Sequence, residues 1–144
     1  MSEPRRRFVR RHPWLSLYLA LLVASTAVRA LRPAPALPAG MKSVELPALA
    51  KDGGTAAAGP VRFAWRELGD PGSTKPPLLL LHGSPGRGGD LAALAAALPG
   101  DRRILVPDLP GFGASTRSLP DYSILTHAHY TIDWLDRLGV GEVD

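Results

Sequence analysis

The chain has 144 residues, enough for one ordinary domain, and its hydrophobic content of 45% is normal for a globular protein. The absence of cysteine excludes a disulfide framework, a thiolate metal site and a cysteine nucleophile. The net charge of +4 comes from the N-terminus, because residues 1–32 carry seven arginines and one acid, whereas residues 33–144 carry ten basic and twelve acidic residues. Since the larger part has no basic stripe, we predict no nucleic-acid partner.

Residues 1–31 form a basic leader followed by an apolar segment. Five arginines precede Pro13, and the stretch PWLSLYLALLVASTAV at 13–28 carries no charge. This pattern is typical of a membrane anchor or of a signal peptide, here with small residues before a cleavage point at 28–30, and a soluble amphipathic segment is the third interpretation. Because arginines favour the cytoplasmic side, the first two interpretations place the rest of the protein outside the cytoplasm, either anchored in the membrane through residues 13–31 or exported after cleavage.

Residues 32–60 are rich in proline, alanine and glycine. This composition predicts an extended linker between the leader and the folded domain. The stretch KSVEL at 42–46 is a candidate for a first short strand inside it.

From residue 61 to residue 144 the sequence has the regular pattern of a folded domain. The alternation in VRFAWREL at 61–68 predicts a half-buried strand, and the continuous apolar runs at 78–83 and 102–108 predict inner strands that are covered on both faces. Strands that alternate with helices predict an α/β domain with a mostly parallel sheet and flanking helices.

Two helices are predicted, at 89–98 and 122–140, and GEVD at 141–144 has the pattern of the entry to a further strand. In the second helix the apolar residues share one stripe, which predicts the face that packs on the core. The residues of that stripe are Ile124, Ala128, Ile132, Leu135 and Leu138.

The turn HGSPG at 82–86 follows the first inner strand directly. Gly83 and Gly86 permit a tight turn, which leaves the backbone N–H of Ser84 free beyond the strand end, where a donor can hold a developing oxyanion. Pro85 stiffens the turn, and the Ser84–Pro85 bond is a candidate cis peptide. A purely structural turn is the alternative, and the His82 side chain is expected to tie the turn to backbone groups rather than to act as a base.

The loop DLPGFGAS at 108–115 ends the second inner strand in the same way. Parallel strands end at the same edge of a sheet, so both turns should face one crevice. We expect Asp108 to accept backbone N–H groups of its own loop, and Gly111 and Gly113 to allow the loop to shape the crevice. Neither Ser84 nor Ser115 fits the Gly-x-Ser-x-Gly pattern of a nucleophile, because each lacks one of the two glycines.

The remaining histidines do not form a metal-binding pattern. His12 lies in the leader, and His127 and His129 are two positions apart on a predicted helix, where their side chains point in different directions. We therefore predict no metal site.

Together, LLLLHGSPG, VPDLPGFGAS and LDRLGVGEVD resemble the N-terminal half of an α/β-hydrolase, over roughly residues 61–144. The His-Gly-x-Pro motif resembles the branch that holds epoxide hydrolases, haloalkane dehalogenases, proline iminopeptidases and many esterases. The resemblance implies that the Ser84 N–H supplies half of an oxyanion hole. It also implies structural roles in the turn for His82, Gly83, Pro85 and Gly86, and a crevice-shaping role for Asp108, Gly111 and Gly113.

The resemblance further implies hydrolysis of an ester, amide, epoxide or carbon–halogen bond through a covalent intermediate on a serine or aspartate nucleophile. That nucleophile, the acid and the catalytic histidine are expected beyond Asp144, so the chain as given is expected to stop before the nucleophile and to be inactive alone. The implied partner of the complete protein is a small-molecule substrate, and no cofactor is implied. A non-catalytic binding protein on the same fold and an inactive truncated product are the alternatives.

Overall fold

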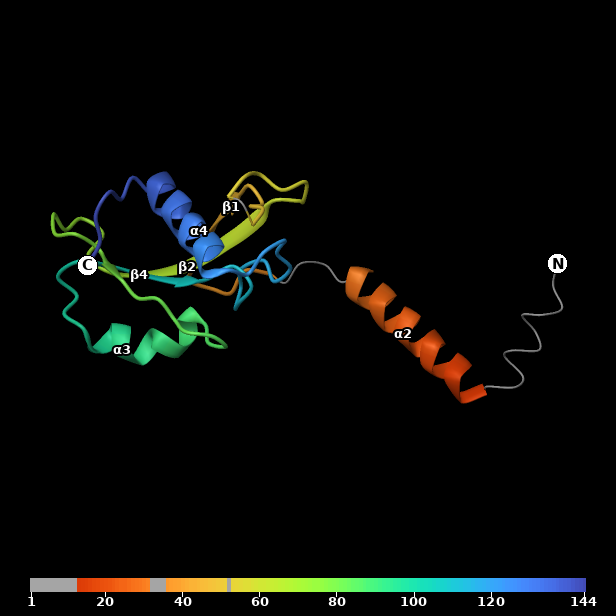
Figure 1. Cartoon of the computed structure of the whole chain (residues 1–144). Helices are drawn as coiled ribbons and strands as arrows, with labels where there is room; N and C mark the ends of the chain where they lie inside the picture. Colours follow the sequence, from red (N-terminus) through yellow and green to blue (C-terminus); the bar gives the residue numbers. More distant parts are fainter. Residues whose placement is uncertain (1–12, 32–35, 52) are drawn as a thin grey trace. The chain divides into compact units, whose positions relative to one another are not determined.

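The computed structural model describes residues 13–31, 36–51 and 53–144, which belong to two compact units (Figure 1). The first unit holds helix α2 (Pro13–Leu31), whose large apolar side chains, such as Trp14, are exposed. No helix in the described part of the chain is both long and apolar enough to cross a membrane. The predicted membrane anchor at 13–31 is therefore not confirmed.

The second unit, Ala36–Asp144, is built on a four-stranded sheet. Its strands are β1 (Met41–Leu46), β2 (Val61–Gly69), β3 (Leu78–Leu79) and β4 (Arg103–Asp108), in the order β1-β2-β4-β3. The candidate strand at 42–46 is thus confirmed as β1.

The described sheet is mixed, whereas the sequence predicted a mostly parallel one. Only β3 and β4 are parallel, because β2 pairs antiparallel with both β1 and β4. The link from β2 to β3 explains the difference, since residues 70–77 form a loop without a crossover helix. A short loop reverses the chain, and a parallel neighbour requires a much longer connection.

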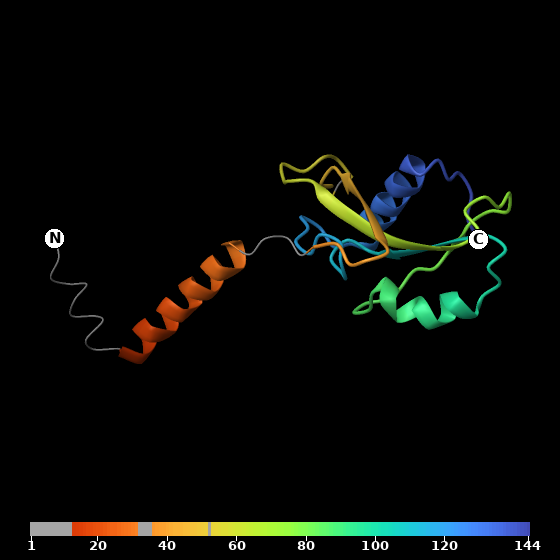
Figure 2. The ribbon, with the colours of Figure 1, turned by 180° about the vertical axis from the view of Figure 1, so that it is seen from behind.

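Two helices cover opposite faces of this sheet, as both views show (Figures 1 and 2). The short 3-10 turn η1 (Gly88–Leu91) leads into α3 (Ala92–Ala97) on one face, and α4 (Ile124–Arg137) lies on the other. Side chains alternate along β4, so Leu105 joins the core beneath α4, while Ile104 and Val106 join the core beneath α3. The strand is buried on both faces, as its continuous apolar run predicted.

Helix α4 is rotated relative to the predicted orientation. Trp134 is fully buried and its ring stacks on Phe63 at a centroid distance of 4.7 Å. Ala128 is exposed, as are Ile124 and Ile132, whose exposed fractions are 89% and 54%, so this part of the predicted core stripe is wrong. The aromatic face removes more apolar area from water than the aliphatic stripe does, because aromatic side chains are the larger ones.

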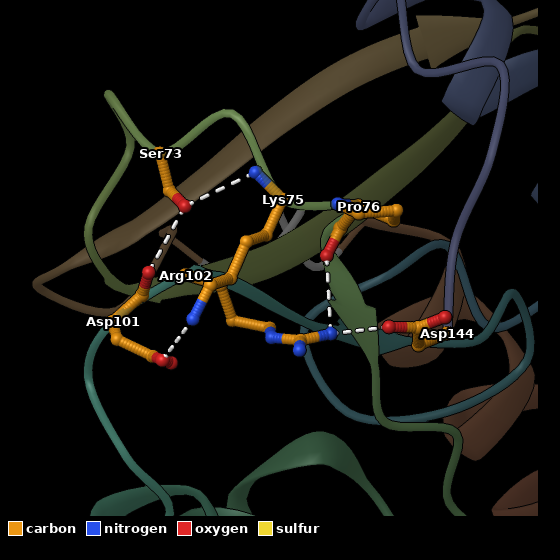
Figure 3. A network of polar contacts seen from close by, with 6 residues as sticks. All are labelled: Ser73, Lys75, Pro76, Asp101, Arg102 and Asp144. Atoms are coloured by element: carbon orange, nitrogen blue, oxygen red, sulfur yellow. Dashed lines mark hydrogen bonds and ion pairs between the residues drawn. The ribbon is translucent and has the colours of Figure 1, made fainter.

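A polar network joins the loops that precede β3 and β4 (Figure 3). The Ser73 hydroxyl donates to the backbone carbonyl of Asp101 at 2.9 Å, and the Lys75 ammonium pairs with the Asp101 carboxylate. Arg102 donates to the carbonyl of Pro76. These contacts lie at the amino ends of the two parallel strands, so they fix the edge opposite to the two glycine-containing turns.

Asp144 occupies a strand position beside β3. Its N–H donates to the carbonyl of Pro77 at 3.0 Å, and its carbonyl accepts from the N–H of Leu79 at 2.9 Å, which is the pattern of parallel pairing. The Asp144 carboxylate pairs with Arg102 (Figure 3). These bonds are of the kind that a strand beside β3 would make, and the further strand after GEVD stays a prediction.

Candidate active site

A hollow of about 740 Å³ opens at the carboxyl ends of β3 and β4, between the two turns and the first half of α4. Ser84 of the first turn and Leu109 of the second both line it. The predicted shared crevice is therefore present. Its walls are mainly apolar, formed by Leu81, Leu109, Phe112, Ile124, Ala128 and Ile132.

The HGSPG turn places Ser84 on the wall of this hollow. The Ser84–Pro85 bond is cis, as the sequence suggested, and the turn closes through a 2.7 Å bond from the N–H of Gly86 to the carbonyl of Gly83. The N–H of Ser84 donates to no acceptor in the described part of the chain. Gly83 lies outside the left-handed region, and a β-carbon there would meet no atom within 4 Å, so the turn itself does not require a glycine at that position.

His82 ties the first turn to the second loop. Its side chain is 7% exposed, and its Nε2 accepts from the N–H of Leu109 at 3.0 Å. Because Nε2 is an acceptor, the ring proton lies on Nδ1, which donates to the carbonyl of Gly83 at 3.0 Å. Both ring nitrogens are used in these two contacts, so the His82 side chain joins the two loops and offers no free ring nitrogen to the hollow.

Asp108 also links the loop after β3 to the loop after β4. Its carboxylate is 4% exposed and accepts the N–H of Gly88 and the N–H of Ala114, each at 2.7 Å. The bond to Ala114 lies within its own loop, as expected, but the bond to Gly88 joins the loop after β3. At Gly113 the backbone is left-handed (φ +50°), and a β-carbon would collide with this carboxylate, so the sequence needs glycine there.

Ser115 is buried away from the hollow. Its hydroxyl donates to the backbone carbonyl of Asp108 at 2.5 Å and accepts from the N–H of Ala64 at 2.8 Å. Gly111 has φ +98°, and its N–H donates to the carbonyl of Thr116 at 2.7 Å. These bonds close the crevice-shaping loop and leave Ser115 no role as a nucleophile.

His127 is the site residue that sequence reasoning missed. It lines the hollow from the first turn of α4, and its buried Nδ1 has no hydrogen-bond partner in the described part of the chain. Burial lowers the pKa of His127, the charge of Asp121 partly opposes this, and His82 lowers it further. The sequence did contain one indication of this role for His127. A helix that follows the loop after β4 begins at the carboxyl edge of the sheet, so residues in its first turn lie near the two turns.

No cluster of three metal-ligating side chains occurs among the described residues.

The lowered pKa of His127 predicts a dependence of stability on pH. The unfolded chain takes up a proton near the ordinary pKa of 6.5, whereas the folded chain resists protonation until a lower pH. The free energy of unfolding should therefore fall as the pH drops below 6.5. Urea denaturation above and below this pH measures how much the free energy of unfolding changes with pH. This change should be smaller in His127→Gln and the same as in the wild type in His129→Gln. An unchanged pH dependence in His127→Gln would refute its assignment to His127.

Comparisons with known proteins define the class to which this arrangement belongs. A family profile described as the alpha/beta hydrolase fold matches residues 76–144. An esterase from Thermogutta terrifontis superposes with a TM-score of 0.56 and 27% identity, over 71% of this chain and 34% of that enzyme. The strand order, the two turns and this match agree, and they support the assignment of residues 76–144 to the α/β-hydrolase superfamily.

Within the superfamily, haloalkane dehalogenases are among the similar proteins. The haloalkane dehalogenase of Mycolicibacterium paratuberculosis is 34% identical over 71 residues, which are 47% of this chain and 24% of that enzyme. An ancestral haloalkane dehalogenase superposes with a TM-score of 0.53 and 29% identity, over 58% of this chain and 28% of that structure. The chain thus spans about a quarter of the length of the curated relatives it matches.

Proposed function

We propose that this chain is the N-terminal part of an α/β-fold hydrolase that cleaves an ester or a carbon–halogen bond in a small molecule. The observation that carries the proposal is the unpartnered N–H of Ser84 on the wall of an apolar hollow. An esterase and haloalkane dehalogenases among the similar proteins support these two bond types. The nucleophile, the acid and the catalytic histidine belong to residues beyond Asp144 in this proposal.

The proposed role of the Ser84 N–H is to stabilise an oxyanion. A serine nucleophile that attacks an ester, or water that attacks the alkyl ester of an aspartate nucleophile, produces a tetrahedral carbon with a negatively charged oxygen. A donor that is already oriented and has no other acceptor stabilises this charge without reorganisation. His82 and Asp108 would hold the donor in place, because they join the turn to the loop after β4.

A hydrolysis assay tests this proposal directly. The product of the whole reading frame should release nitrophenol from a short p-nitrophenyl ester or bromide from a short 1-bromoalkane. Substitution of the residue at the nucleophile position by alanine should abolish the release. The proposal fails if the folded product releases neither, and binding of the same molecules without turnover would favour a non-catalytic binding protein on this fold.

We also propose that the hydrolase domain lies outside the cytoplasm. The support is the cluster of five arginines before the apolar segment at 13–28, since positive charge favours the cytoplasmic side. Alkaline phosphatase fused after Asp144 should be active in a bacterial host and lose activity when residues 1–31 are deleted. Equal activity of both fusions would refute this localisation.

A further inference from the structure

A second, polar hollow of about 480 Å³ lies beside the apolar one. The loop after β3 contributes Arg87 and Asp90 to its walls, and the loop after β4 contributes Arg117. Phe112 borders both hollows, and Ser84 of the apolar hollow is followed directly by Pro85 of the polar one. The apolar and the polar hollow are therefore neighbours.

The charges on the walls of the polar hollow favour an anion. Asp90 is its one acid, and this carboxylate is already used, because it accepts the N–H of Arg87 at 3.0 Å and lies 3.5 Å from the Nε of the same residue. The Arg117 side chain makes no hydrogen bond or ion pair in the described part of the chain. The walls of the polar hollow thus carry two guanidinium groups and one carboxylate, which gives a net charge of +1.

Neither arginine is part of the buried core. The side chains of Arg87 and Arg117 are exposed, and neither belongs to the hydrophobic cores on the two faces of the sheet. The buried carboxylate nearest to this region, Asp108, is fully occupied by the N–H groups of Gly88 and Ala114, so it does not neutralise the arginines by direct contact. Guanidinium groups are well suited to carboxylates, which they bind through paired N–H donors.

We propose that the polar hollow is a subsite for a carboxylate, and that the substrate is an amphipathic molecule with an apolar body in the first hollow and a carboxylate against Arg117 and Arg87. The statement that this ligand is a substrate rests on the proposed function. It predicts a preference for anionic over neutral molecules of the same skeleton. The arginines lie outside the oxyanion-binding turn, so they contribute to binding and not to the chemical step.

Binding measurements on the full chain test the subsite without requiring turnover. In buffer of low ionic strength, 6-phenylhexanoate should bind about fivefold more tightly than 6-phenylhexan-1-ol, the size expected of a solvent-exposed ion pair. Nuclear magnetic resonance titration measures both affinities. Arg117→Gln should remove the preference, Arg117→Lys should restore part of it, and Arg137→Gln, which deletes the same charge at the far end of α4, should leave it intact.

Three results would overturn the subsite. The first is equal affinity for the acid and the alcohol, the second is an undiminished preference in Arg117→Gln, and the third is loss of the preference in Arg137→Gln. Inorganic phosphate serves as a competing anion. If phosphate binds at Arg117 while the acid binds no more tightly than the alcohol, the polar hollow binds free anions. The proposal of an amphipathic substrate is then wrong. If the chain shows the preference but the product of the whole reading frame hydrolyses nothing, the proposed function is refuted and the carboxylate site stands.

Discussion

Replacing Ser84 by proline should lower the turnover number of the proposed hydrolase by about 100- to 1,000-fold, the usual cost of removing one oxyanion donor. Proline has no backbone N–H, so the substitution deletes the donor on the wall of the apolar hollow. The Michaelis constant should change much less, because the donor acts on charge that develops only during the reaction. Steady-state kinetics on the product of the whole reading frame measures both quantities.

Ser84→Ala is the matched control, because it removes the hydroxyl and keeps the N–H. This variant should retain most of the turnover number. An amide-to-ester replacement at Ser84 removes the N–H alone and covers the case in which proline distorts the turn. If both the ester and the proline variants turn over normally while folded, the N–H of Ser84 is not an oxyanion donor.

Replacing Asp108 by alanine should lower the free energy of unfolding by about 2–5 kcal/mol, because the N–H groups of Gly88 and Ala114 lose their acceptors in a buried place. Asp108→Asn should cost less, since the amide oxygen still accepts one of the two N–H groups while its NH₂ faces the other. Urea denaturation monitored by tryptophan fluorescence measures both. The expected order is wild type, asparagine variant, alanine variant, from most to least stable.

Asp136→Ala is the control for this series, because Asp136 is exposed on α4 and its carboxylate forms no hydrogen bond or ion pair within the described residues. Its free energy of unfolding should stay within about 0.5 kcal/mol of the wild-type value. An Asp108→Ala protein as stable as Asp136→Ala would show that Asp108 does not join the two loops.

The parts that sequence predicted best depend on local chemistry. The alternating pattern at 61–68 and the apolar run at 102–108 gave β2 and β4 nearly to the residue, because burial on one or both faces leaves a clear period. The cis Ser84–Pro85 bond and the tight turning at Gly111 and Gly113 also follow from backbone rules that apply to a few residues at a time. The crevice then follows from the rule that parallel strands end at one edge.

The parts that sequence did not predict depend on contacts between distant residues. Helix α4 carries apolar residues on two sides, and periodicity could not choose between the side of Ile124 and the side of Trp134. The bond from Gly88 to Asp108 spans two loops, so the pattern within one loop could not reveal it. His127 was missed for the same reason, because its place in the hollow is set by the packing of α4 on the sheet.

We propose that the two turns form the N-terminal half of a hydrolase site whose nucleophile lies beyond Asp144, and Asp144 is already hydrogen-bonded to the backbone of Pro77 and Leu79. The most direct measurement is the nucleotide sequence of the reading frame after the codon for Asp144. We expect it to encode an apolar strand followed within a few residues by Gly-x-Ser-x-Gly or by a turn with aspartate at the same position, and a histidine much later. A stop codon at that point, or a strand followed by a turn without serine or aspartate, would contradict the claim.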